Sequence, residues 1–204
     1  MSKKEVVLDC DFLSSLLENT SVDFFKQVMD ELDVCPVVHS YVADEELEYC
    51  SEAQDLIKEG YIRKIDYDEY LHSDLQREQY NQAVWFIMDI INDEKLPPQK
   101  YQNVFRDGFS YKNHSIGEVL SELMAKELGL ELFASNDFGA KSIAKRHINS
   151  TYYTLKVRNL AEIFDEIGHR ENGLKWKDIK AALRDENDRW KRDKDKLRSL
   201  WIKD

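Results

Sequence analysis

Short apolar runs that end close to an acidic residue constrain the fold of this chain more than any other feature. Residues 6–8 (VVL) form such a run, and Asp9 follows at once. A continuous run of this kind is typical of a strand buried in a parallel sheet, where ligands lie at the carboxyl ends of the strands. Residues 130–134 predict a second buried strand, with Asp137 shortly after it. The sequence therefore predicts an α/β domain with acidic side chains at one edge of its sheet.

A third acidic residue, Glu118, lies in the first turn of a predicted helix in the stretch SIGEVLSELMAKELG. The apolar residues recur at helical spacing and are Ile116, Val119, Leu120, Leu123, Met124 and Leu128. A helix-capping explanation is also open, because Ser115 and Glu118 match the S-x-x-E capping box.

The order of these features resembles the PIN domain. An Asp follows the first strand, a GE pair opens a helix that ends in ELG, and a later strand ends in S-N-D-x-G-A. The resemblance runs from about residue 5 to about residue 168 and is interrupted by an insertion. It implies a three-layer α/β/α domain with a central, mainly parallel sheet. It also implies a metal-dependent nuclease site built from Asp9, Glu46, Glu118 and Asp137.

The second acidic position is the least certain in register. The stretch VCPVVHSYVADEELEY offers Glu46, followed by Leu47, as the best match. Asp44 and Glu45 stay open as alternatives, because an error of one residue in helix phase turns a side chain by about 100°.

Clustered carboxylates explain why such a site would take a cation. Carboxylates a few ångströms apart resist ionising together unless a cation compensates them. Oxygen ligands favour Mg²⁺ or Mn²⁺ over zinc, and such an ion activates water for attack on a phosphodiester. Ser135 and Asn136 are expected to help position a ligand or phosphate.

Each acidic residue also has a purely structural explanation. Asn136 or Asp137 could cap a helix, Asp9 could begin a turn, and Glu46 could belong to a solvated acidic face. Taken together and in the family's order, the four residues favour the site.

The net charge of −11 is unevenly distributed. Residues 138–204 hold 17 Lys and Arg against 11 Asp and Glu, whereas residues 1–137 hold 12 against 29. A nucleic acid would meet the basic part first. The candidates for phosphate contacts are Lys141, Lys145, Arg146, Lys156 and Arg158. The alternative is a solvated face whose cations pair with acidic neighbours.

Other classes of protein lose support. The sequence contains no Walker A motif, no G-x-G-x-x-G and no G-x-S-x-G, and its five histidines show no metal-ligand spacing. Its three cysteines form no C-x-x-C pair and suit a reducing cytoplasm. No run approaches the ~20 apolar residues that span a bilayer, so no membrane partner is expected.

Two segments extend the expected nuclease domain of residues 1–168. Residues 60–113 predict a helical insertion, with Ser73 or Asp74 as its cap, and an aromatic-rich loop at 97–113 that could stack bases, cover the site or pack on itself. Residues 169–204 predict a charged helical extension. Its sparse apolar stripe consists of Trp176, Ile179, Leu183, Trp190, Leu197 and Trp201. A stripe this thin must dock on its own domain, on a second copy or on another protein.

We therefore expect strands near residues 5–9, 34–38, 130–134 and 152–157, with a helix over 137–146. The expected function is a metal-dependent endoribonuclease that cleaves single-stranded RNA. The resemblance further implies a toxin of a toxin–antitoxin pair, with an antitoxin as partner, although this chain is longer than such toxins usually are. A structure-specific DNA nuclease and a non-catalytic binding module are the alternatives.

Overall fold

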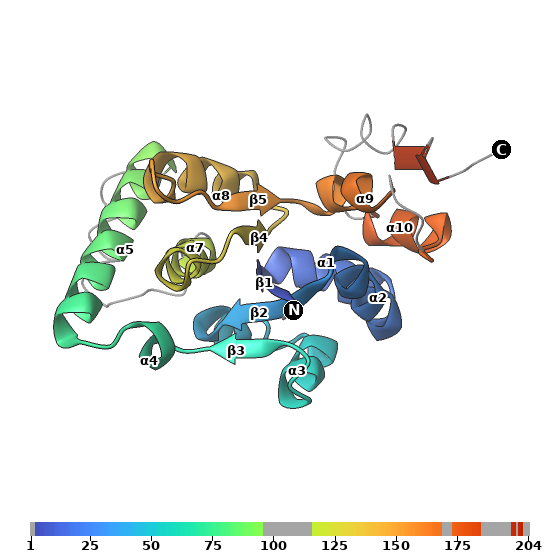
Figure 1. Ribbon diagram of the computed structural model, residues 1–204, viewed down its shortest axis with the longest axis horizontal. Coiled ribbons are helices and arrows are strands. Elements are labelled where there is room, and N and C mark those ends of the chain that lie inside the picture. Colours follow the sequence, from blue (N-terminus) through green and yellow to red (C-terminus); the bar gives the residue numbers. More distant parts are fainter. Residues whose placement is uncertain (1–2, 96–115, 169–172, 185–196, 199, 202–204) are drawn as a thin grey trace.

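The computed structural model describes residues 3–95, 116–168, 173–184, 197–198 and 200–201. Within them, five parallel strands form one sheet in the order β3-β2-β1-β4-β5. The strands are β1 (Lys4–Leu8), β2 (Val34–His39), β3 (Arg63–Ile65), β4 (Leu132–Ala134) and β5 (Lys156–Arg158). Helices lie on both sides of this sheet (Figure 1), so the domain has the three-layer α/β/α architecture that the sequence predicts.

One face of the sheet receives the helices that follow β1 and β2 and the helices at the end of the chain. They are α1 (Cys10–Asn19), α2 (Val22–Leu32), η1 (Val42–Glu46), α3 (Ser51–Lys58), α9 (Leu160–Gly168) and α10 (Trp176–Ala182). Because side chains alternate along a strand, Val6 and Leu8 of β1 point into this core. Val7 points into the core on the opposite face.

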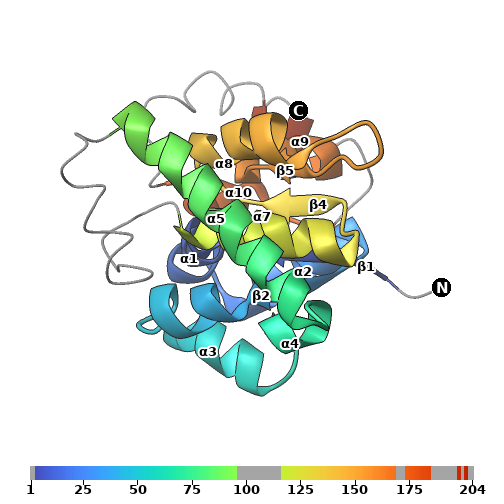
Figure 2. The ribbon, with the colours of Figure 1, turned by 90° about the vertical axis from the view of Figure 1, so that its left-hand side faces the viewer.

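The opposite face is covered by the helices that follow β3 and β4. They are α4 (Tyr67–Tyr70), α5 (Asp74–Lys95), α7 (Ile116–Leu128), α8 (Phe138–Ile143) and η2 (Ala144–Ile148). Helix α5 crosses over α7, which lies between α5 and the sheet (Figures 1 and 2). Residues 116–125 are therefore all buried, including the polar ones.

Helix α5 matches the helix expected in the insertion. Ser73 caps it by accepting a hydrogen bond from the Gln76 amide at 3.2 Å. The apolar residues Tyr80, Val84, Ile87, Met88 and Ile91 are buried as their spacing predicts. No described helix is long and apolar enough to cross a membrane. The aromatic loop at 97–113 and Ser115 lie outside the described residues.

Three elements differ from the expected ones. The strand predicted at 152–157 begins only at Lys156, because residues 150–153 form a turn in which the Ser150 amide donates to the Tyr153 carbonyl at 2.8 Å. The helix predicted at 137–146 is divided into α8 and the wider turns of η2, in which the Asn149 amide donates to the Ala144 carbonyl. Strand β3 lies within residues 60–113, which were expected to hold only helix and loop.

The described part of the C-terminal extension packs on its own domain. Ile179, Leu183 and Leu197 are buried in the same core as α1 and α2. The indole of Trp201 lies so close to Gly168 that a Cβ there would come within 2.8 Å of its nitrogen. Trp190 lies outside the described residues.

Candidate metal and phosphodiester site

The site lies where the sheet changes its winding direction. The chain leaves β1 for one face through α1 and leaves the neighbouring β4 for the opposite face through α8. Between two such strands the connections diverge, and a crevice opens at the carboxyl ends. Asp9 directly follows β1, and Ser135 directly follows β4. The sequence thus places polar side chains at the one point of this sheet where the topology leaves room for a ligand.

Asp9 is fixed by the neighbouring strand. Only 2% of its surface is exposed, and its amide donates to the Ala134 carbonyl at 3.0 Å, which extends the β1–β4 ladder by one bond. The Ser135 hydroxyl donates to Asp9 Oδ2 at 2.8 Å and accepts from the Asp137 amide at 3.1 Å. Ser135 therefore connects two of the four predicted site residues and holds Asp9 in one orientation.

Asp137, one of the predicted site residues, is also a helix cap. It is the N-cap of α8, and its Oδ1 accepts from the Gly139 amide at 2.6 Å. The two explanations that the sequence leaves open are therefore compatible, because the cap uses only one of the two carboxylate oxygens.

Three neighbouring side chains at the second acidic position lie in different directions. Asp44 pairs with Lys64 at 3.2 Å on the surface, and Glu45 is exposed. Glu46 is half-buried and turns toward Asp9 and the start of α7. Of the three alternatives, Glu46 is the one that lies at the site.

Gly117 makes this position of Glu46 sterically accessible. A Cβ built on Gly117 would lie 2.5 Å from Glu46 Oε2 and in closer contact still with Oε1. The Gly117 backbone also forms a hydrogen bond to the Glu46 carboxylate. The GE pair therefore has a physical explanation: the glycine admits the carboxylate of η1, and Glu118 next to it supplies the carboxylate of α7.

Helix α7 carries two buried carboxyl groups toward the site. Glu118 is 6% exposed and Glu122 is fully buried. Glu118 Oε2 and both oxygens of Glu122 have no hydrogen-bond partner. Buried polar groups are normally satisfied, and an unpartnered one points to a proton, a water or an ion at that place.

The carboxyl groups of Asp9, Glu46, Glu118 and Glu122 have pKa values well above those usual for carboxyl groups. Burial is the main cause in each case, and repulsion from neighbouring carboxylates adds to it. Together they raise the pKa of Asp9 to about 7, of Glu46 to about 7 and of Glu118 to about 10. Burial, and then repulsion from Glu118, also raise the pKa of Glu122 well above its usual value. The site therefore has more carboxyl groups than it can ionise by itself.

The donor set fits a hard divalent cation in its chemistry. Carboxylate and hydroxyl oxygens are the ligands that Mg²⁺ and Mn²⁺ prefer, and the unpartnered oxygens of Glu118 and Glu122 offer lone pairs that no donor uses. Among the described residues, no three His, Cys, Asp or Glu side chains are already arranged to hold an ion. Side-chain rotation would have to draw the carboxylates together around a cation.

The five predicted phosphate-contact residues do not gather in one place. Lys141 is neutralised by Glu162, whose carboxylate oxygens lie 2.6 and 2.7 Å from its ammonium group. Lys145 and Arg146 are exposed on η2. Lys156 and Arg158 line a different pocket, whose other walls come from the starts of β1, β2 and β4, the end of α2, the segment before β4 and α9.

Asn136 has a structural role in this fold. Its amide nitrogen donates to Ser15 Oγ at 3.2 Å, and its oxygen accepts from the Leu160 amide at 3.1 Å. It thereby joins α1 to the start of α9 beneath the site. Ser135, by contrast, contacts a site carboxylate directly.

Two acidic residues near the site are not among the predicted ones. Asp11 lies in the first turn of α1, where burial and Asp137 raise its pKa. Glu122 lies one helical turn after Glu118. Both could have been found from spacing, because Asp11 is two residues from Asp9 and a residue four positions along a helix lies on the same face.

No protein-family model, curated protein or solved structure matches this chain.

Proposed function

We propose that this protein is a metal-dependent endonuclease that cleaves single-stranded RNA. The observation that carries the proposal is the convergence of Asp9, Glu46, Glu118 and Asp137. They come from four separate segments of the chain, and they lie near enough to the switch point of a parallel sheet to influence one another electrostatically. Carboxyl groups that repel one another in a buried place destabilise the fold, unless a positively charged ligand uses them.

The four carboxylates would hold Mg²⁺ or Mn²⁺, with Glu122 behind Glu118. A cation there would neutralise charge on a phosphodiester and lower the pKa of a water for in-line attack. The chain's own residues supply the orientation. The Ser135 hydroxyl fixes one oxygen of Asp9, Gly117 admits Glu46, and the cap at Gly139 fixes one oxygen of Asp137.

The resemblance to the PIN domain supports the same reaction class. The Asp, the GE pair and the S-N-D-x-G-A segment of that resemblance correspond here to Asp9, to Gly117 and Glu118, and to residues 135–140. All three lie at the same edge of the sheet. The preference for RNA over DNA comes from this resemblance, because the same carboxylates could act on either backbone. The exposed cations Lys145 and Arg146 of η2, the element that follows α8, are the proposed phosphate contacts. Three free cysteines agree with a cytoplasmic location.

The test compares Glu46→Gln with Glu45→Gln, a matched change at the neighbouring residue, which points away from the site. Wild type, both variants and Asp9→Asn are titrated with Mn²⁺ and with Mg²⁺. Thermal stability is followed in parallel with cleavage of an RNA oligonucleotide and of its DNA counterpart.

We expect Mn²⁺ to raise the Tm of wild type and of Glu45→Gln, and both to cut the RNA oligonucleotide. Asp9→Asn and Glu46→Gln should lose at least about a hundredfold in cleavage rate, as removal of a preorganised charge at a reacting phosphate does. Cleavage of DNA but not of RNA would show that the substrate is DNA and would support the same metal-dependent cleavage of phosphodiester bonds. Equal loss in Glu45→Gln and Glu46→Gln, or no metal effect on wild type, would falsify the assignment of this site.

A further inference from the structure

The amino-terminal end of the sheet contains a pocket that the nuclease site does not use. It has a volume of about 450 Å³, within the range of small-molecule sites. Its walls include the first residues of four strands: Lys4 of β1, Val34 of β2, Leu132 of β4 and Lys156 of β5. Asp9, by contrast, follows the last residue of β1.

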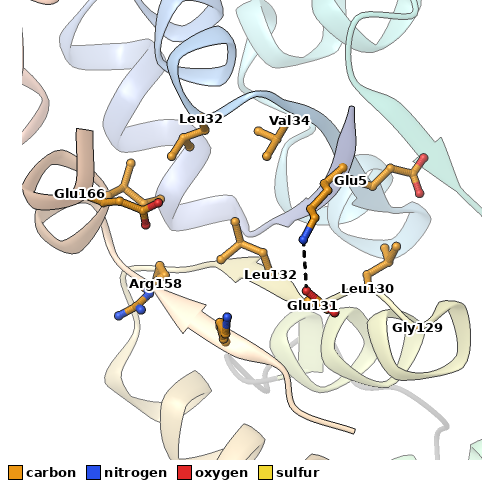
Figure 3. A pocket seen from close by; sticks show the side chains of 12 residues that line it. Glu5, Leu32, Val34, Gly129, Leu130, Glu131, Leu132, Arg158 and Glu166 are labelled. Atoms are coloured by element: carbon orange, nitrogen blue, oxygen red, sulfur yellow. Dashed lines mark hydrogen bonds and ion pairs between the residues drawn. The ribbon is translucent and has the colours of Figure 1, made fainter. Parts of the chain in front are cut away.

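The pocket exists because α2 ends before it covers the strand starts. Helix α2 stops at Leu32, and Asp33 takes a left-handed conformation with φ 55° that turns the chain directly into β2. The apolar part of the pocket consists of Leu32, Val34, Leu132 and Ile163. Figure 3 shows Leu32 and Val34 on one side of the space, with Leu132 opposite them.

The acidic residues around the pocket all have partners. Glu5 accepts from Arg63 at 2.9 Å, and its side chain points away from the Lys4–Glu131 pair (Figure 3). Glu131 is 3.5 Å from Lys4 across one end of the pocket. Glu166 also forms an interaction. The charges of Glu5 and Glu131 are therefore already paired.

Two cations at the pocket have no such partner. Lys156 and Arg158 stand two residues apart on β5, so they project to the same face of the sheet. Neither forms an ion pair with any residue in the described part of the chain. The charge that the pocket can still accept is therefore negative.

We propose that this pocket binds a small organic anion, with its apolar body against Leu32, Val34 and Leu132 and its charged head at Lys156 and Arg158. The head is a carboxylate or a phosphate monoester, since both match a guanidinium beside an ammonium group. This inference is independent of the nuclease proposal, because the side chains that form the pocket are not among those proposed to hold the metal.

Four probes with the same eight-carbon chain separate the contributions of charge and of apolar contact. Octanoate and octyl phosphate carry the two negative heads, octanol is neutral, and octylammonium is positive. Binding to the full-length protein is measured by isothermal titration calorimetry. We expect both anions to bind saturably, and octanol and octylammonium to bind at least roughly tenfold more weakly, the effect of one charge-assisted contact. The relative affinity of octanoate and octyl phosphate distinguishes the two sources of the head group.

The double variant Lys156→Gln/Arg158→Gln should weaken the binding of both anions by roughly tenfold or more and leave octanol unchanged. The Arg158 carbonyl, which accepts from the Ser135 amide, is retained in this variant. The matched control is Lys177→Gln/Lys180→Gln, which removes the same charge from exposed positions outside the pocket. It should change anion affinity by no more than about twofold.

Leu32→Trp tests the apolar part separately, because the larger side chain would occupy the pocket and weaken all probes. Circular dichroism and thermal unfolding establish that each variant is folded, and the single changes Lys156→Gln and Arg158→Gln replace the double one if it is not. Octanol binding as tightly as octanoate, equal anion binding in the two double variants, or no saturable binding would each overturn the proposal.

Discussion

The acidic side chains at the two ends of the sheet differ in burial and in pairing. At the carboxyl ends, Asp9, Glu118 and Glu122 are buried, and no described cation pairs with them. At the amino ends, Glu5 and Glu131 are paired with Arg63 and Lys4 at the surface. Surface pairs contribute little to stability, whereas buried like charges cost several kcal/mol. The fold tolerates that cost at one end only, which is where a functional constraint is expected.

The pH dependence of stability is the most direct test of this difference between the two ends of the sheet. In metal-free protein with EDTA, Asp9 and Glu46 have folded pKa values of about 7 and Glu118 of about 10, all above their unfolded values. The folded state then binds more protons than the unfolded state above about pH 4. We expect the free energy of unfolding to fall by on the order of 10 kcal/mol between pH 5 and pH 9.

Urea unfolding at both pH values measures this effect, with Asp9→Asn as the comparison. The variant should lose part of the slope, because it removes one of the titrating groups. Saturating Mn²⁺ should flatten the slope as well, since the cation favours the ionised carboxylates. A slope that Asp9→Asn leaves unchanged would contradict the assignment.

His39, the last residue of β2, gives a pH effect of opposite sign. It is fully buried, its Nδ1 accepts from the Tyr41 amide at 3.0 Å, and its Nε2 lies 3.0 Å from the Tyr70 hydroxyl. Burial lowers its pKa to about 4, so its contribution is complete above about pH 6.5 and is lost as the pH falls toward 4. The loss amounts to roughly 3 kcal/mol. Nitrogen NMR of the imidazole should show a neutral ring protonated at Nε2 down to about pH 5, and a charged ring at pH 6 would refute this.

Gly117→Ala would add a steric clash at the site without changing any charge. The added Cβ collides with the Glu46 carboxylate, and we expect a loss of about 2 kcal/mol together with lost cleavage. In the Glu46→Ala background the collision is gone, and the same change should be neutral or slightly stabilising, because alanine favours a helix over glycine. Thermal unfolding of the four proteins in this cycle gives the coupling. If Gly117→Ala changed stability equally in wild type and in Glu46→Ala, the added methyl group would not be colliding with Glu46.

Lys4→Gln at the amino end should have the smallest effect. Its partner Glu131 is largely exposed, and the two atoms are 3.5 Å apart. We expect a change within about 0.5 kcal/mol in urea unfolding. A loss of 2 kcal/mol would show that the paired end is as sensitive as the acidic end.

The sequence predicted the strong features of this fold and missed those that depend on tertiary contacts. Buried apolar runs located β1, β2 and β4, and helical spacing located α5 and α7. Strand β3 has the sequence RKI and no apolar run, so it is a strand only because β2 offers it an edge. The turn at 150–153 was missed because Tyr152 and Tyr153 have high strand propensity, while Tyr152 is 98% exposed.

The site shows the same division. Asp9 and Asp137 could be placed from strand ends, and Glu118 from its helix. The choice of Glu46 over Asp44 and Glu45 depended on the helical phase of η1, which a count along the sequence cannot fix. The pairing of Lys141 with Glu162 was invisible, because it joins α8 to α9 across the fold.

The strand order also sets when the site can form during synthesis. Strand β1 is made first, yet it lies between β2 and β4, and the hydroxyl that orients Asp9 belongs to Ser135, 126 residues later. At typical rates of translation, roughly 6–25 s separate the two residues. A nascent chain therefore carries Asp9 without its orienting partner until Ser135 has been added and has left the ribosome.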